Sequence, residues 1–214
     1  MRLDHVSYVA SHEQISDTVQ RIGSQIGTAF VDGGIHPRFG TRNFTAPLLN
    51  GQYIEVVCAL DHPAAEQTAF GQAVSKKAAE GGGWLTWVFA VEDIAPIESA
   101  IGRQAINGHR RRPDGTDLKW KQIGVRELLT DPELPFFIEW QDGHHPSEVG
   151  TPTTRIEAIV FSDENPLGKS AFGNEIREAL KANNTSVVVE EMNKEEQGIL
   201  AINFHTRTGA ILID

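Results

Sequence analysis

Three side chains with metal-binding and proton-carrying groups stand at corresponding places along the chain. His5 lies in LDHVSYVA, Glu55 in YIEVV and Glu139 in FIEWQ. Each segment has the β-branched and aromatic composition of a strand, in which alternate side chains face the same side. If Val6 and Ile54 pack on a helix, His5 and Glu55 face the opposite, concave side of the sheet. A histidine and carboxylates that converge there have the donor atoms for a divalent metal.

These segments belong to two copies of one βαβββ pattern, over residues 1–60 and 83–142. The opening strands align Leu3 with Leu85, Val6 with Val88 and Val9 with Val91. Helix candidates follow in EQISDTVQRIG and IAPIESAIG, whose isoleucines and valine recur at spacings of three and four. His5 and Glu55 are 55 − 5 = 50 residues apart, and Trp87 and Glu139 are 139 − 87 = 52 apart. We therefore predict a duplication, with Trp87 as a pocket wall where a second histidine would be wanted.

The rest of the chain continues the pattern. Residues 61–83 are rich in Ala, Gln and Lys and predict a helical connector that ends at a glycine run. After HHPSEVGTPTT, a strand, a helix and three strands are expected again, with Ala158 and Leu212 where the first copy has His5 and Glu55. We predict an α+β protein with paired βαβββ modules in residues 1–150 and a divergent third βαβββ-like module in residues 151–214. An unrelated α+β tail is the alternative.

Four segments resemble the vicinal oxygen chelate superfamily, and most closely its glyoxalase-like domain proteins. They are LDHV, HPRFGTRNF (His36 to Phe44), YIEVV and PFFIEW (Pro135 to Trp140), and the resemblance covers roughly residues 1–146. In that superfamily paired modules form a cup around a metal, with ligands from the first and fourth strands of each module. The resemblance implies His5, Glu55 and Glu139 as ligands, with Trp87 at the fourth position, where an indole cannot coordinate. The superfamily spans lyases, dioxygenases, epimerases, thiol transferases and metal-free binding proteins, so the fold does not select the activity.

The loop HPRFGTRNF and its counterpart GHRRRPDGTDLKWKQIG hold the candidate substrate-binding residues. His36, Arg38, Arg42 and Asn43 have donors that suit a carboxylate or carbonyl, with a solvated hairpin as the alternative. In the counterpart, Trp120 lines the cup or packs in a core. The run from Arg110 to Arg112 is typical of a solvated turn. The adjacent His144 and His145 are also typical of a turn, with a place at the rim of the cup as the alternative.

Composition excludes several classes of function. The formal net charge of −10 argues against a nucleic-acid or anionic-membrane partner. No apolar run approaches the roughly 20 residues of a membrane span, and no secretory signal precedes Asp4 and His5. The one cysteine, Cys58, forms no internal disulfide, which suits a cytoplasmic setting.

Two functions from different classes remain open. In the first, a divalent ion (Zn, Ni, Mn or Fe) held by His5, Glu55 and Glu139 polarises a carbonyl or enediolate oxygen of a small substrate, and a glutamate moves a proton. The protein would then be a lyase or isomerase of the glyoxalase type. In the second, a metal-free module sequesters a small aromatic or drug-like compound in an aromatic cup of Phe44, Trp87, Trp120 and Trp140, with Glu55 and Glu139 binding a cationic group. The sequence leaves open whether the modules pair within the chain or across a homodimer.

Overall fold

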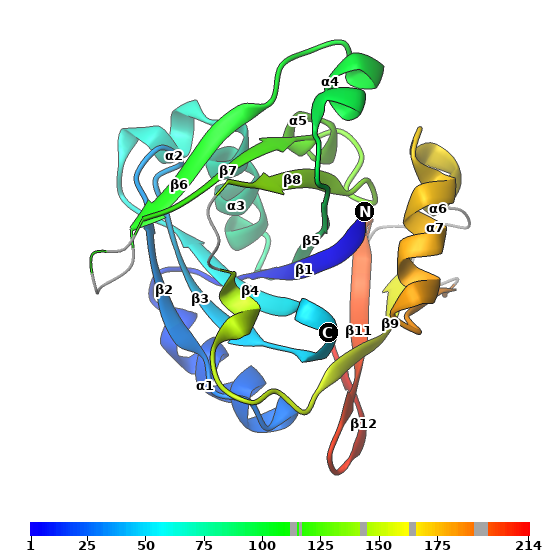
Figure 1. The fold of residues 1–214 in the computed structure, drawn as a ribbon. Helices are drawn as coiled ribbons and strands as arrows, with labels where there is room; N and C mark the ends of the chain where they lie inside the picture. The colour runs from blue at the N-terminus through cyan, green and yellow to red at the C-terminus, as the bar shows by residue number, and fades with distance from the viewer. Residues whose placement is uncertain (112–114, 116, 142–144, 163–165, 191–196) are drawn as a thin grey trace.

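The fold is built from a closed barrel and a second sheet that covers part of its outside (Figure 1). The computed structural model describes residues 1–111, 115, 117–141, 145–162, 166–190 and 197–214. Within these ranges the barrel has the strand order β1-β4-β3-β2-β6-β7-β8-β5. The predicted α+β fold class with tandem modules is confirmed.

Each half of the barrel is one βαβββ module. The first consists of β1 (Arg2–Val9), α1 (Ile15–Ile26), β2 (Val31–His36), β3 (Thr41–Pro47) and β4 (Tyr53–Ala59). The second consists of β5 (Gly83–Ala90), α4 (Ala95–Ile101), β6 (Ile106–Arg111), β7 (Asp117–Ile123) and β8 (Phe136–Trp140). In each module the first and last strands pair in parallel. The two modules meet within one chain, because β1 pairs antiparallel with β5 and β2 pairs antiparallel with β6.

The β1–β5 pairing is interrupted by an extra residue on each strand. Leu3 pairs with Phe89 and His5 with Val88, which leaves Asp4 unpaired as a β-bulge. Leu85 is the extra residue on β5. A bulge changes the side to which the following residue points. As a result Leu3 joins the core outside the barrel, whereas His5 lines the cavity inside it.

Helices cover both faces of the first module. The apolar stripe of α1 packs on the outer side of β4, against Ile54, Val56 and Cys58. The connector forms α2 (Pro63–Gln67) and α3 (Ala69–Ala79), as the composition of residues 61–83 predicts. Helix α3 packs with the inward-facing Val9 and Val57, together with α5 (Val125–Leu128). The connector therefore fills one part of the barrel interior.

The C-terminal residues form a four-stranded sheet with the order β10-β9-β11-β12. Its elements are β9 (Arg155–Phe161), α6 (Pro166–Lys169), α7 (Gly173–Ala182), β10 (Ser186–Val189), β11 (Ile199–Thr206) and β12 (Gly209–Ile213). The expected succession of elements is present, but β9 pairs with β10 and β11, not with the last strand. Leu212, the expected counterpart of Glu55, therefore lies on edge strand β12 and is exposed.

Two tryptophans of β5 join the barrel to this sheet. Trp84 donates from Nε1 to the Ile213 carbonyl at 2.8 Å. Trp87 is fully buried against Phe161, with ring centroids 4.9 Å apart. The expectation that Trp87 lines the cup is wrong in this respect: Trp87 pairs with the outward-facing Val6 and shares its face. Of the helices that the structure describes, none has the length and apolar character to span a membrane.

Candidate functional site

A cavity inside the barrel holds polar groups between aromatic walls. Its lining comes from both modules and from α3: His5, His36, Phe39, Asn43, Tyr53, Glu55, Phe70, Arg110, Trp120, Gln122, Phe136, Ile138 and Trp140. The space open to the centres of water molecules is about 30 Å³. One buried water needs about 10–15 Å³ of such space, so the cavity takes about two waters or a group of similar size.

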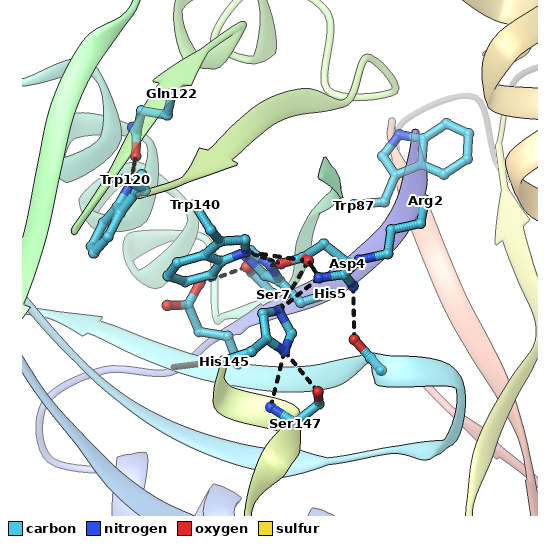
Figure 2. Close-up of polar contacts among 12 residues, drawn as sticks. Arg2, Asp4, His5, Ser7, Trp87, Trp120, Gln122, Trp140, His145 and Ser147 are labelled. Atoms are coloured by element: carbon cyan, nitrogen blue, oxygen red, sulfur yellow. Dashed lines mark hydrogen bonds and ion pairs between the residues drawn. The ribbon is translucent and has the colours of Figure 1, made fainter. Parts of the chain in front are cut away.

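Asp4 is the hub of the hydrogen bonds behind His5 (Figure 2). Its fully buried carboxylate accepts from His5 Nδ1 at 2.9 Å, from His145 Nε2 at 3.0 Å and from Trp140 Nε1 at 3.3 Å. The guanidinium of Arg2 lies 2.7 Å from the same carboxylate. Burial alone raises the pKa of Asp4, but the hydrogen bonds from His145 and His5 outweigh it and hold that pKa well below its usual range. Asp4 is therefore charged at neutral pH.

The Asp4 contact fixes the orientation of the His5 ring. A charged carboxylate accepts hydrogen bonds only, so Nδ1 carries a proton, and in the neutral form of the ring Nε2 presents a lone pair. The ring stacks on Tyr53, with centroids 4.4 Å apart, and meets the edge of Phe136 at 6.2 Å. His5 thus lines the cavity, with Nδ1 held by Asp4 and Nε2 on the other side of the ring.

Glu55 is a buried carboxylate held at both oxygens. Ser7 donates to Oε2 at 2.7 Å, and Asn43 donates from Nδ2 to Oε1 at 2.6 Å. Burial raises the pKa of Glu55, but the nearby His5 and His36 and these two hydrogen bonds lower it below its ordinary value. The site therefore contains a fixed negative charge beside the His5 ring.

Asn43 connects this carboxylate to a buried cation. Its Oδ1 accepts from Arg110 Nη1 at 3.1 Å, and the Arg110 side chain is almost fully buried. The two side chains cross β2 at Gly33, where a Cβ atom would lie 2.1 Å from Asn43 Oδ1 and 2.5 Å from Arg110 Nη1. Glycine is therefore required at position 33 for the polar chain from Glu55 to Arg110 to form.

His36 is a neutral histidine at the aromatic end of the cavity. Its Nδ1 lies 2.9 Å from Thr41 Oγ1, and its ring meets Trp120 edge-on at 5.6 Å. Burial lowers the pKa of His36 to about 4, against the opposing effect of Glu55. The neutral His36 ring can form a hydrogen bond with a ligand, but it has no charge with which to form an ion pair.

The structure brings together some of the predicted site residues and separates others. His5, His36, Asn43, Glu55 and Trp120 line one cavity, and Trp140 joins them. Arg38 is exposed, and Arg42 lies on the outer face, where it pairs with Asp32 at 2.6 Å. Phe44 is beneath the Arg42 guanidinium and packs on the outer core. Arg112 and His144 lie outside the described residues.

The predicted metal set is not assembled, because Glu139 faces outward. Its Oε2 accepts from the backbone N–H of Ile94 at 2.9 Å at the start of α4, and its Oε1 lies 3.3 Å from Lys121 Nζ. Burial raises the pKa of Glu139, but the hydrogen bond from Ile94 and the contact with Lys121 lower it overall.

In β5 and β8, the inward positions that correspond to His5 and Glu55 are apolar. Val88 pairs with Phe136, as His5 pairs with Tyr53, and Ala90 pairs with Ile138, as Ser7 pairs with Glu55. Val88 and Ile138 therefore occupy the places of the second histidine and the second carboxylate. Across the described ranges, no three His, Cys, Asp or Glu side chains are grouped so that they could hold a metal ion. The side chains present do not fit the metal site that the superfamily implies.

Sequence reasoning missed three groups of the site. Asp4 directly precedes His5, and a regular strand places neighbours on opposite faces. Arg110 stands in a basic run with the appearance of a solvated turn. Gln122 has neither charge nor motif to mark it. The alternation of β6 and β7 is a usable signal for Arg110 and Gln122. Arg110 lies two positions after Gly108 on the inner face of β6, and Gln122 lies two positions after Trp120 on the inner face of β7.

A barrel of two βαβββ modules with a polar cavity defines the class of vicinal oxygen chelate proteins. The chain matches the family described as Glyoxalase-like domain over residues 3–174, and so belongs to that family. The resemblance seen in the sequence is thereby confirmed. No curated protein matches the chain.

The chain is similar to several solved structures at low sequence identity. A hypothetical protein from Staphylococcus aureus is 17% identical with a TM-score of 0.57, over 99% of this chain and 84% of that one. Methylmalonyl-CoA epimerase from Mycobacterium tuberculosis is 15% identical with a TM-score of 0.46, over 67% of this chain and 89% of that one. The Streptomyces coelicolor epimerase in complex with 2-nitronate-propionyl-CoA is 14% identical with a TM-score of 0.45, over 67% and 99%.

Proposed function

We propose that the protein is a glyoxalase-like enzyme that moves a proton on a small carbonyl compound inside the barrel without a metal ion. The observation that carries this proposal is the pair of His5 and Glu55, each fixed by its own buried partners and both on the cavity wall. Imidazole is the most frequent proton carrier in enzymes, and its orientation here leaves Nε2 free to act as a base.

The chemistry that follows is removal of a proton from a carbon next to a carbonyl group. The C–H bond breaks, the proton passes to His5 Nε2, and the electron pair moves onto the carbonyl oxygen to form an enolate. Glu55 then stabilises the imidazolium through its negative charge, since its lowered pKa makes it a poor base. Return of the proton to the same carbon gives epimerisation. In an α-hydroxy carbonyl compound, transfer of the hydroxyl proton to the enolate oxygen and return of the carbon-bound proton to the former carbonyl carbon give isomerisation, with no oxidant needed.

The metal-dependent form of the hypothesis has less support, because only His5 and Glu55 of the expected ligands face inward. The drug-sequestering alternative also has less support. Of its four aromatic side chains, only Trp120 and Trp140 line the cavity, while Trp87 and Phe44 pack outside the barrel. Space for about two waters does not admit a drug-sized ring system without repacking. A cytoplasmic location and a homodimer stay predictions.

The proposal is tested by deuterium exchange. Pyruvate, hydroxyacetone and dihydroxyacetone are incubated with the protein in D₂O, and loss of the α C–H signals is followed by proton NMR. Chelator-treated wild-type protein should accelerate exchange of at least one compound, and His5→Gln should reduce the rate by about 10²-fold or more. Glu55→Gln should also abolish exchange. The matched control is Glu139→Gln, a change on the outer face that should leave the rate unchanged. Exchange that disappears with the chelator, or no exchange across the panel, contradicts the proposal.

A further inference from the structure

The Gln122 side-chain amide has a fixed orientation in the cavity wall. Trp120 Nε1 lies 2.7 Å from Gln122 Oε1 (Figure 2). An indole N–H can only donate, so the oxygen of the amide must face it and the NH₂ group must point the other way. Both residues lie on the inner face of β7, two positions apart, and both line the cavity.

The NH₂ group of Gln122 is a buried donor with no acceptor in the described part of the chain. The residue is 3% exposed, and Nε2 has no hydrogen-bond partner among the residues that the structure describes. A buried donor left unpaired costs about 1–3 kcal/mol. Because Gln122 lines the cavity, a ligand bound there can supply the missing acceptor.

We propose that Gln122 Nε2 donates a hydrogen bond to the carbonyl oxygen of the ligand, and that the ligand presents a small aldehyde, ketone or carboxylate group to this cavity. An N–H donor selects an oxygen acceptor and rejects an ammonium group, which has donors only. Room for about two waters fits a carbonyl group with one or two carbon neighbours and excludes an aromatic ring.

The donor is held rigidly enough to select its partner. The Trp120 ring lies over Gly108, where a Cβ atom would be 2.3 Å from the indole, so the ring can approach β6 only because residue 108 is glycine. Trp120 also meets His36 at 5.6 Å and Trp140 at 5.7 Å between ring centroids. A preorganised donor stabilises negative charge on an oxygen with little reorganisation.

This inference rests on the proposed function in one respect, namely that the oxygen held by Gln122 is the one that becomes the enolate oxygen. Binding and proton transfer are nevertheless measured separately. If the probes reach Gln122 and no compound exchanges its α-proton, the proposed function fails and the binding role stands. If exchange proceeds and the Gln122 variant leaves both binding and rate unchanged, the inference fails and the proposed function stands.

The experiment follows the side-chain signals of Gln122 and Trp120 in ¹H–¹⁵N NMR spectra of the full chain. Acetone and acetate are titrated as neutral and anionic carbonyl probes, and methylammonium as a donor-only probe of similar size. Acetone or acetate should shift the Gln122 NH₂ and Trp120 indole signals saturably, and methylammonium should not. The probe that binds with the lower Kd, acetone or acetate, shows whether the cavity prefers a neutral carbonyl or a carboxylate. No saturable shift with either carbonyl probe, or an equal shift with methylammonium, overturns the inference.

Two isosteric variants provide the matched comparison. Gln122→Glu keeps an acceptor for Trp120 and replaces the free donor by an oxygen, so the Kd of the responding probe should rise by about tenfold or more. Gln20→Glu makes the same change on the exposed side of α1 and should leave the Kd unchanged. An unchanged Kd in folded Gln122→Glu contradicts the inference. If that variant does not fold, the wild-type titration still decides the question.

Discussion

Asp4 and His5 are consecutive residues of one strand, yet Asp4 Oδ2 lies 2.9 Å from His5 Nδ1. Neighbours in a regular strand face opposite sides. The contact exists because Asp4 is the extra residue of a β-bulge opposite β5. The bulge turns His5 into the cavity and leaves the Asp4 carboxylate directly behind its ring, where Trp140 of the second module and His145, which follows that module, also reach it.

Asp4→Asn should therefore impair both stability and proton transfer. An amide has one oxygen to accept from His5, His145, Trp140 and Arg2, and its NH₂ group would face donors. Loss of the buried charge should lower the free energy of unfolding by roughly 3 kcal/mol, measured by urea denaturation. It should also release the His5 tautomer, measured by ¹⁵N shifts of the ring.

The matched control for this change is Asp32→Asn. Asp32 pairs with Arg42 where both side chains are about one-third exposed, so the change should cost no more than about 1 kcal/mol. A His5 ring that keeps its proton on Nδ1 in Asp4→Asn would contradict the role given to Asp4.

Stability should fall with acid through His36. The buried ring has a pKa of about 4 instead of the ordinary 6.5. Between these values the unfolded chain binds a proton that the folded chain does not. The contribution of His36 is therefore complete above pH 6.5 and is lost as the pH falls to about 4, which amounts to about 3 kcal/mol.

The measurement is the urea midpoint at several pH values between 7.5 and 4.5. His36→Gln should flatten the dependence, and His12→Gln, on the surface, should leave it unchanged. Direct NMR titration of the His36 ring is the second readout. A ring that titrates near 6.5 in the folded protein would contradict the prediction.

The sequence predicts the duplicated modules correctly but misplaces the register of the second. Alternation gives two faces for a strand, and the helix side is recognised by its apolar residues. This works for β1 and β4, where His5 and Glu55 interrupt an apolar pattern. In β5 both faces are apolar, because the C-terminal sheet covers the outside against Trp87. Alternation alone then cannot select the inward residue.

The observed counterparts restore the spacing of the repeat. Val88 and Ile138 are 138 − 88 = 50 residues apart, the same as His5 and Glu55. The pair of Trp87 and Glu139, at 52 residues, is shifted by one position at each end. The polar character of Glu139 favoured it over Ile138, yet its carboxylate is explained by the N–H of Ile94. A polar residue on a strand can thus face the cavity or bind the start of a neighbouring helix, and only tertiary packing distinguishes the two.

Glu139→Gln should act on α4 and not on the cavity. The neutral amide keeps an acceptor for the Ile94 N–H but loses the charge beside Lys121, so the cost in stability should be below about 1 kcal/mol. Binding of the carbonyl probes should be unchanged.

Glu55→Gln should abolish exchange, because the charge that stabilises the His5 imidazolium is removed. Metal analysis of protein purified without chelator should find no stoichiometric divalent ion, and a stoichiometric ion lost in Glu139→Gln would restore the original ligand set.

Gly33→Ala should disconnect Arg110 from Asn43. The residue does not have a positive φ, so the substitution tests the space and not the backbone conformation. The added methyl group meets both side chains and should cost about 1–3 kcal/mol. Asn43 would then leave Glu55 with one hydrogen bond fewer, which should raise the pKa of Glu55, measured by ¹³C NMR of its carboxyl carbon. An unchanged carboxyl titration would show that Asn43 does not depend on Gly33.

Removal of residues 151–214 should unfold the barrel and not release an independent domain. We propose these residues as a separate module, because they form their own sheet, but their apolar side chains pack in one hydrophobic core with those of β5. Trp87 is buried against Phe161, and Trp84 bonds the Ile213 carbonyl. The truncated chain would expose both indoles, and Trp87→Ala in the full chain should alone cost about 3–5 kcal/mol. Circular dichroism and proteolysis check the truncation. A folded 1–150 fragment with dispersed NMR signals would establish the two-domain division instead.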